Sequence, residues 1–153
     1  AKVTLYHNGD SRVVNLQDFF LGPGENALKP GEILKSISLP LPTSEKRADY
    51  QRFSIRKSMD IALVTTATKL LVVNGKCQEI NIFLGAVGPT PIRAIKAEEL
   101  LRDQIVTPER IMEVAEMCAG EAVPITDIRA TKEYRRIIVT NLINESLSTL
   151  AGF

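Results

Sequence analysis

The sequence is poor in the residue types that most often carry chemistry. Its 153 residues include no tryptophan, one histidine and two cysteines. A single histidine, His7, leaves no Ser–His–Asp set to assemble. Cys77 and Cys118 lie far apart and outside any CxxC pattern, so the chain alone does not supply a zinc or iron–sulfur site. Each cysteine falls in an apolar periodic segment, which predicts two reduced thiols in the core.

The chain also lacks an excess of one charge and a long apolar run. Nineteen basic residues face 18 acidic ones, for a net charge of +1, so there is no basic footprint for nucleic acid. No apolar run approaches the roughly 20 residues of a membrane span. The first residues, AKVTLYHNGD, are typical of a strand and a turn and not of a signal peptide. We therefore expect a soluble cytoplasmic protein that binds neither membrane nor nucleic acid.

What is present divides into two zones, residues 1–42 and 43–153. In the first zone, KVTLY and RVVNL flank the turn HNGD, which predicts a β-hairpin, and ILKSISLP predicts a further strand. A hairpin alone is only marginally stable. Because the chain opens inside one, we expect it to be a portion of a longer protein.

The second zone places strands first and helices after. Strands are predicted over 50–58, 61–73 and 77–84, as an antiparallel meander. Helices are predicted over 94–103, 107–122 and 131–151, the last with apolar residues on more than one stripe, so that it is largely buried or faces two partners. This order indicates an α+β fold, with an antiparallel three- or four-stranded sheet and helices packed on one face.

Two features invite a functional interpretation. FLGAVGPTPIRA, Phe83–Ala94, is a glycine-rich turn between a strand and a helix, but it lacks both the GK[ST] ending of a phosphate loop and the third glycine of a dinucleotide fingerprint. It is therefore predicted to be a structural turn. The second feature is a set of arginines, Arg52, Arg56, Arg93, Arg129, Arg135 and Arg136. They allow two interpretations, an ion-pair network or a set of donors for an anionic ligand.

Four strings in order, covering nearly the whole chain, carry a family resemblance: LKPGEILKSISLP, YQRFSIRKSMDIALV, FLGAVGPTPIRA and DIRATKEYRR. Together they resemble the FAD-binding (medium) flavoprotein subunit of the molybdenum hydroxylases. That family includes xanthine dehydrogenases, carbon monoxide dehydrogenases and 4-hydroxybenzoyl-CoA reductases. The resemblance implies that residues 43–153 form the flavoprotein C-terminal α+β domain. It implies that residues 1–42 are the incomplete C-terminal tail of the FAD-binding domain.

The resemblance also implies a function, that of an FAD-dependent oxidoreductase subunit. In the family, electrons leave the substrate at a molybdopterin centre and pass through two [2Fe–2S] clusters on partner subunits or domains. They then reach FAD and go on to NAD+ or another acceptor. The implied partners are an iron–sulfur subunit, a molybdopterin subunit and an upstream FAD-binding lobe. The glycine-rich loops that hold the FAD pyrophosphate in the family lie upstream of the matching part, so this chain alone is expected to be inactive.

Three residues are assigned to the cofactor by resemblance, and none is assigned to catalysis or to a metal. Leu34 is expected to make a hydrophobic flavin contact, and Arg52 stands where the family usually has a lysine. Asp60 ends the segment IRKSMD, which passes the flavin in family members and can gate access to it. Met59 in that segment replaces an acid that some members carry. The alternative is that this chain is an interaction module that packs on the FAD domain and partner subunits without holding flavin.

Four further residues are interpreted as architecture. Asp127, Arg129, Tyr134 and Arg135 surround the start of the last helix, and an arginine–aspartate pair there can satisfy buried polar groups. We therefore expect these side chains to lock the helix in place.

Overall fold

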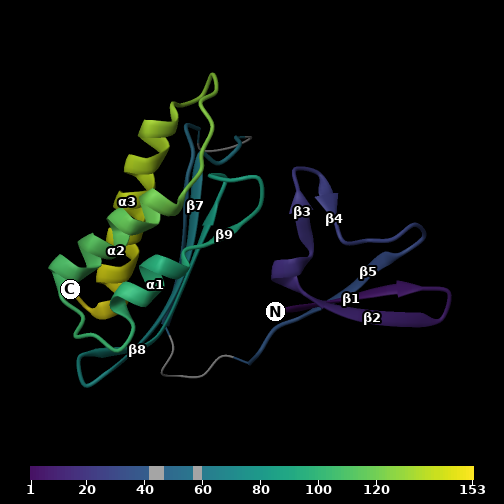
Figure 1. Ribbon diagram of the computed structural model, residues 1–153, viewed down its shortest axis with the longest axis horizontal. Coiled ribbons are helices and arrows are strands. Elements are labelled where there is room, and N and C mark those ends of the chain that lie inside the picture. The colour runs from purple at the N-terminus through teal and green to yellow at the C-terminus, as the bar shows by residue number, and fades with distance from the viewer. Residues whose placement is uncertain (42–46, 57–59) are drawn as a thin grey trace. The chain divides into compact units, whose positions relative to one another are not determined.

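The computed structural model describes residues 1–41, 47–56 and 60–153, and the chain divides into two compact units, Ala1–Thr43 and Ser44–Phe153. Each unit has its own hydrophobic core. The predicted α+β fold is confirmed (Figure 1). The strand predicted over 50–58 ends at Phe53 and the one predicted over 61–73 begins at Val64. Residues 57–59, which include Met59, lie outside the described residues. The assignment of the first unit to the tail of an FAD-binding domain stays a prediction.

The first unit is built on a three-stranded antiparallel sheet. The predicted hairpin is strands β1 (Lys2–His7) and β2 (Asp10–Asn15), joined through Asn8 and Gly9, which both have positive φ as this tight turn requires. Strand β5 (Ile33–Ser38) pairs with the other side of β1, in the order β2–β1–β5. In the sequence, β2 and β5 are separated by a 3-10 turn and two short strands, η1 (Leu16–Asp18), β3 (Phe20–Gly22) and β4 (Glu25–Asn26).

Polar contacts tie the loop before β5 to this hairpin. Arg12 Nε and Nη2 each donate to the Glu32 carboxylate at 2.7 Å. These hydrogen bonds, together with one from the Lys29 backbone N–H, lower the pKa of Glu32 to about 2. The Nδ1 atom of His7 lies 2.8 Å from the carbonyl oxygen of Gly31. The single histidine of the chain is thus part of a structural contact.

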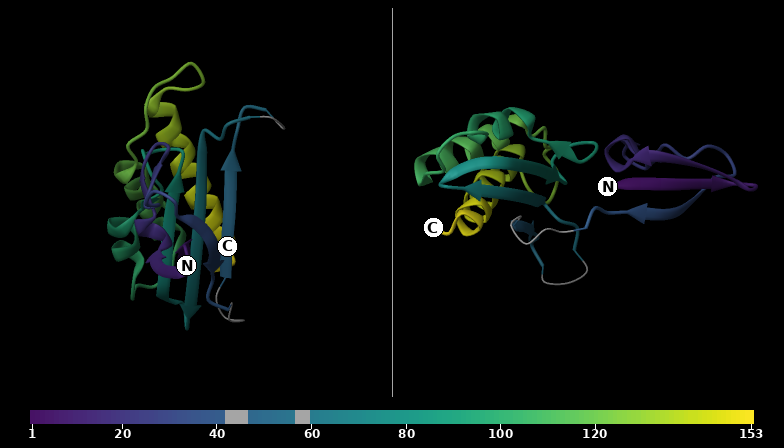
Figure 2. Two further views of the ribbon diagram at one scale, coloured as in Figure 1. Left: turned by 90° about the vertical axis from the view of Figure 1, so that its right-hand side faces the viewer. Right: turned by 90° about the horizontal axis from the view of Figure 1, so that it is seen from below.

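The second unit is a four-stranded antiparallel sheet with three helices on one face (Figures 1 and 2). Its strands follow one another in space as in sequence: β6 (Arg47–Phe53), β7 (Val64–Val73), β8 (Lys76–Gly85) and β9 (Ile92–Arg93). The short β9 was not predicted from periodicity, because two residues are too few to show one. The helices are α1 (Ile95–Leu101), α2 (Pro108–Glu121) and α3 (Lys132–Ala151).

The core lies between the sheet and the helices. Alternate residues of β7 and β8 face the helices, and the buried face of β8 consists of Cys77, Ile80, Ile82 and Leu84. Helix α2 buries its predicted stripe, which includes Cys118. Both cysteines are free and buried, as expected. Burial raises the pKa of both thiols, that of Cys77 to about 11, so both stay protonated.

Helix α3 has two packing partners within its own unit. It lies against α2 and against strands β6 and β7, which accounts for apolar residues beyond a single stripe. One polar contact is buried in this layer, between the hydroxyl groups of Thr68 on β7 and Ser146 on α3. Ile137 and Tyr134 remain exposed on the outer side.

The stretch Phe83–Ala94 turns the chain, as predicted. A Cβ on Gly85 would lie 2.3 Å from Oγ1 of Thr65 on the neighbouring strand, and one on Gly88 would lie 2.6 Å from Cδ1 of Ile92. A larger residue at either position would force the neighbouring Thr65 or Ile92 side chain to move, so close packing accounts for both glycines. Neither position needs a ligand to explain it.

A buried carboxylate joins helix α1 to the sheet. The side chain of Glu98 is 1% exposed. It accepts hydrogen bonds from the Ile82 backbone N–H at 3.0 Å and from Arg93 Nε and Nη2 at 2.9 and 2.8 Å. Arg102, one turn later, adds a longer contact at 3.5 Å. Arg93 thus holds the short helix that follows it, and for this arginine the ion-pair interpretation applies.

We predict that Glu98→Gln lowers the free energy of unfolding by about 2 kcal/mol, because the substitution removes the charge that these donors share. Glu99→Gln, at the next, exposed position of the same helix, is the matched control and should change it by less than about 0.5 kcal/mol. Urea unfolding of the two variants measures the difference. Equal effects would show that the Glu98 charge does not hold α1 to the sheet.

Candidate functional site

Arg52 and Asp60 come together where the chain leaves β6. Nη2 of Arg52 donates to the backbone carbonyl of Asp60. Oδ2 of Asp60 accepts from the Arg56 backbone N–H at 2.7 Å, and this bond is the main reason that the pKa of Asp60 is lowered. Leu34, the third predicted cofactor residue, is 41% exposed and belongs to β5 of the other unit. Two of the three predicted cofactor residues, Arg52 and Asp60, are therefore hydrogen-bonded to each other.

A second polar loop precedes α3. Oδ1 of Asp127 accepts from the backbone N–H groups of Arg129 at 2.9 Å and Ala130 at 3.1 Å. Nη2 of Arg135 lies 3.0 Å from the same oxygen. These contacts, the Arg129 bond foremost, lower the pKa of Asp127 to about 2. Thr131 then caps the helix by accepting from the Tyr134 backbone N–H at 3.2 Å.

Arg135 connects this loop to the sheet. Its side chain is 5% exposed, and Nη1 donates to the carbonyl of Leu63 at 2.8 Å and to that of Ala86 at 3.4 Å. The contacts of Asp127, Arg129 and Arg135 agree with the predicted locking of the last helix. Tyr134 contributes through its ring, which lies edge-on to Phe53 with 6.4 Å between centroids.

The loops after β6 and before α3 enclose a shared hollow of about 370 Å³. Its lining combines aliphatic side chains, two arginines and one carboxylate: Ile55, Arg56, Asp60, Ile61, Ile128 and Arg129. Two guanidinium groups face one carboxylate in this lining, so it offers apolar surface and one net positive charge. It can bind an anionic group, and it presents no nucleophile.

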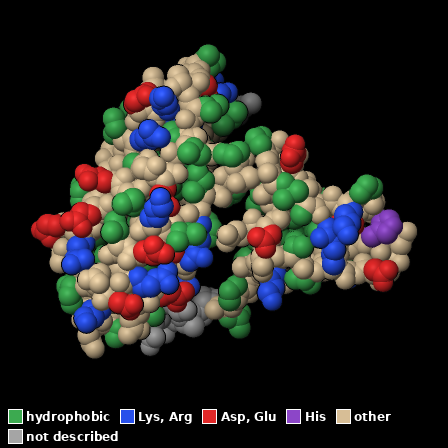
Figure 3. Space-filling model, viewed as in Figure 1, with side chains coloured by type: hydrophobic (Ala, Val, Ile, Leu, Met, Phe, Trp, Pro, Cys, Tyr) green, Lys and Arg blue, Asp and Glu red, His purple; other side chains and the backbone are tan. Residues whose placement is uncertain are grey.

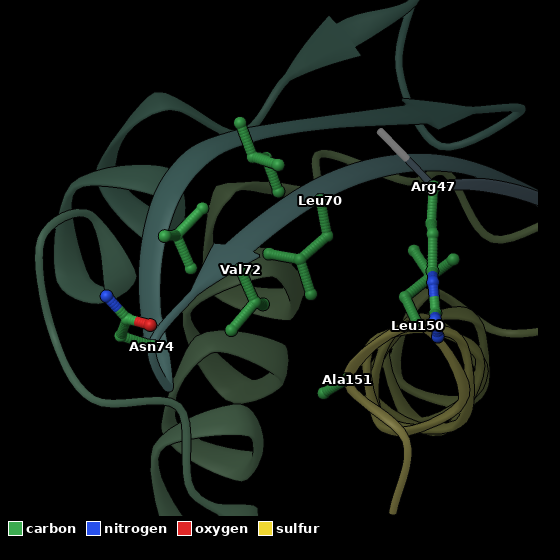
Figure 4. Close-up of a pocket in the computed structure, with 8 residues that line it drawn as sticks. Arg47, Leu70, Val72, Asn74, Leu150 and Ala151 are labelled. Carbon is green, nitrogen blue, oxygen red and sulfur yellow. The ribbon is translucent and has the colours of Figure 1, made fainter. Parts of the chain in front are cut away.

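A larger hollow of about 730 Å³ lies at the far end of β7, beside the C-terminal turn of α3 (Figure 4). It is lined by Arg47, Leu70, Leu71, Val72, Val73, Asn74, Leu150 and Ala151. Figure 4 shows Arg47 extending toward α3 near Leu150. Aliphatic groups, one arginine and one asparagine amide give this lining no acid–base or nucleophilic group.

Within residues 1–41, 47–56 and 60–153, no group of three or more His, Cys, Asp or Glu side chains could hold a metal ion. In the same residues, no helix is long and apolar enough to cross a membrane.

Sequence reasoning overlooked two of the residues that the structure makes important. Glu98 follows Ala97 and precedes Leu101 in the buried stripe of α1, and a carboxylate inside an apolar stripe could have marked it as a buried charge. The side chain of Ile128 is 99% exposed, and nothing in its neighbouring sequence distinguishes it from a core residue.

Comparison with known proteins assigns the fold to a family. Residues 49–150, more than half of the chain, match the model of the CO dehydrogenase flavoprotein C-terminal domain. The chain belongs to this family, and the resemblance drawn from the sequence is confirmed.

Two curated relatives show the extent of the match. The xanthine dehydrogenase FAD-binding subunit of Escherichia coli O157:H7 is 26% identical over 149 residues, which are 97% of this chain and 51% of the relative. The carbon monoxide dehydrogenase medium chain of Afipia carboxidovorans is 29% identical over 125 residues, 82% of this chain and 43% of the relative. The chain thus spans about half the length of these proteins.

Solved structures agree on the fold. A carbon monoxide dehydrogenase from Hydrogenophaga pseudoflava that lacks the Mo-pyranopterin moiety superposes with a TM-score of 0.91 at 25% identity, over 97% of this chain and 52% of that one. Quinoline 2-oxidoreductase from Pseudomonas putida 86 has a TM-score of 0.90 at 24% identity, over 99% of this chain and 52% of that one.

We predict that Asp127→Asn weakens the acid dependence of stability. The folded pKa of about 2 lies below the usual unfolded value of about 3.9. The charge of Asp127 therefore stabilises the protein fully above the unfolded pKa, and this contribution is lost as the pH falls toward 2.

The variant should thus be less stable than the wild type at pH 7, and the gap should close between about pH 4 and pH 2. Thermal unfolding across this range measures the gap, and Glu133→Gln, which removes an exposed carboxylate from the first turn of α3, is the control. A gap that stays constant with pH would contradict the role given to Asp127.

Proposed function

We propose that this chain is part of the FAD-containing electron-transfer subunit of a molybdenum hydroxylase. In this role, electrons from iron–sulfur clusters pass through FAD to NAD+ or another acceptor, and a molybdopterin subunit supplies them. The observation that carries the proposal is the match of 97% of the chain to an FAD-binding subunit of xanthine dehydrogenase. Bound FAD would supply the electron-transfer chemistry, while the protein supplies position and charge.

The surroundings of Arg52 fit the ring end of a flavin. Arg52 is exposed, and its bond to the Asp60 carbonyl holds the end of β6 to the returning loop. Its other N–H groups have no hydrogen-bond partner among the residues that the structure describes. A guanidinium held at one corner keeps donors for the oxygen and nitrogen acceptors of a flavin ring. The role of Asp60 in this arrangement is to position Arg52 and Arg56.

The helix N-termini do not fit the FAD pyrophosphate. Phosphates bind at helix N-termini where backbone N–H groups are free. Here the Ala97 N–H at the start of α1 donates to Glu121 Oε1 at 2.9 Å. Helices α2 and α3 are capped by Thr107 and Thr131, and each carries a glutamate in its first turn. This supports our expectation that the pyrophosphate is held by residues outside this chain.

Strand β5 offers an apolar surface for the upstream FAD-binding lobe. All six of its residues are exposed, and the apolar Leu34 and Ile37 share one face because they pair with Leu5 and Val3 of β1. Exposed apolar residues grouped on one strand are typical of an interaction surface. We infer that Leu34 contacts the flavin only when the lobe is present.

The second candidate function is an interaction module that holds no flavin. The capped helix N-termini favour it, because they leave this chain without an evident phosphate site. The two candidates agree on the parent enzyme and differ in whether these 153 residues contact the cofactor.

We expect the 153-residue chain to bind FAD weakly or not at all. Titration of FAD with the chain, followed by flavin fluorescence and absorbance, measures this. Tight, stoichiometric binding would overturn the interaction-module candidate and would show that the pyrophosphate is held within this chain.

In the full-length subunit that carries these residues, Arg52→Ala should weaken FAD binding about tenfold, the loss of one charge-assisted hydrogen bond of about 1.4 kcal/mol. Arg52→Lys should retain much of the affinity, since it keeps the charge. Arg47→Ala, at the other end of β6, is the control and should bind as the wild type does. An unchanged affinity for Arg52→Ala would remove Arg52 from the flavin site and would support the second candidate.

A further inference from the structure

A patch of exposed isoleucines and arginines surrounds the 370 Å³ hollow described above. Ile55 and Ile61, from the chain between β6 and β7, are 60% and 63% exposed, and Ile128, from the loop before α3, is 99% exposed. Arg56 and Arg129 follow two of these isoleucines and line the same hollow. We call these five residues the isoleucine–arginine patch. Hydrophobic and basic side chains also lie side by side over the α2–α3 loop in Figure 3.

The patch and the charged groups beside it carry one net positive charge, because Arg56, Arg129 and Arg135 face only the two carboxylates of Asp60 and Asp127. The nearby carboxylates of Asp60 and Asp127 both accept backbone N–H groups of their own loops, and Asp127 is also paired with Arg135. Arg129 has one long contact, at 3.3 Å, with Asp127. The Arg56 guanidinium has no hydrogen bond or ion pair to any described residue. An occupant of the patch should therefore be acidic.

The apolar part of the patch identifies the kind of occupant. Single exposed apolar residues are common on protein surfaces. Three isoleucines from two separate segments around one hollow form a contiguous patch, and such patches mark interaction sites. A small ligand in the hollow would leave the fully projecting Ile128 uncovered, and a second copy would bring like charges together. Arginines beside apolar residues are characteristic of protein–protein interfaces.

We propose that the isoleucine–arginine patch is the docking site for a segment of another protein subunit, one that presents a carboxylate flanked by aliphatic side chains. The carboxylate would lie between Arg56 and Arg129, and its aliphatic neighbours would pack on Ile55, Ile61 and Ile128. This inference rests on the proposed function, which supplies the other subunits of the assembled enzyme.

The first test places a photo-crosslinking amino acid at position 128 of the full-length subunit in the assembled enzyme. The control position is Ile95, an exposed isoleucine on α1. We expect position 128 to crosslink to a peptide of another subunit that contains Asp or Glu between aliphatic residues, and position 95 to give no such product. Crosslinks only within the same subunit, or none, would overturn the proposal.

The second test measures the dissociation constant between the FAD-loaded subunit and the rest of the enzyme. Ile128→Asp and Arg129→Glu should each weaken assembly at least tenfold, and Ile95→Asp should not. Increasing salt should weaken assembly of the wild type more than that of Arg129→Gln. Circular dichroism melting and FAD content verify that each variant is folded. If Ile128→Asp does not fold, the milder variant Ile128→Ser replaces it.

The outcomes separate the two proposals. If the FAD-loaded subunit assembles and the patch variants assemble equally well, the docking proposal is wrong and the proposed function stands. If the wild-type subunit carries no FAD and does not assemble, both are wrong.

Discussion

The buried guanidinium of Arg135 joins parts of the second unit that are distant in sequence. It binds the carbonyl of Leu63 just before β7, that of Ala86 just after β8, and the carboxylate of Asp127 in the loop before α3. A buried charge is costly unless hydrogen bonds and a counter-ion compensate it. The Arg135 guanidinium reaches these three partners only when the sheet, the loop and the start of α3 are in their native positions. The interaction therefore sets where the α2–α3 loop lies.

That placement determines the isoleucine–arginine patch. With Asp127 bound to Arg135, Arg129 and Ile128 are carried to the same hollow as Ile55 and Ile61. On the other side of the hollow, Asp60 accepts the Arg56 backbone N–H while its own carbonyl accepts from Arg52. The backbone N–H groups and carboxylates of the two loops contact one another, and the isoleucine side chains are left exposed beside the guanidinium groups of Arg56 and Arg129, the latter at 3.3 Å from Asp127. Glu98 holds α1 to the sheet through buried polar contacts, as Arg135 holds the start of α3.

The family assignment and the contact geometry bear on function in different ways. Membership of the CO dehydrogenase flavoprotein C-terminal domain family relates the chain to proteins such as the FAD-binding subunit of xanthine dehydrogenase. The geometry narrows what this part of such a subunit can do. Its described helix N-termini are all occupied by its own side chains, which leaves none of them free for a ligand. It is not suited to hold phosphates.

By itself, the sequence determined the fold class, the hairpin, the three long strands of the sheet, the three helices and the structural nature of the Phe83–Ala94 turn. These features depend on local periodicity, turn residues and caps, which are readable over a few residues. The arginines at positions 52, 56, 93, 129, 135 and 136 were recognised as a group, but which groups most of them contact was open. Only the tertiary structure decided that Glu98 is buried, that Arg52 meets the carbonyl of Asp60, and that Ile128 faces solvent. Ion pairing and exposure depend on which distant segments meet, and residue type and spacing along one segment do not specify that.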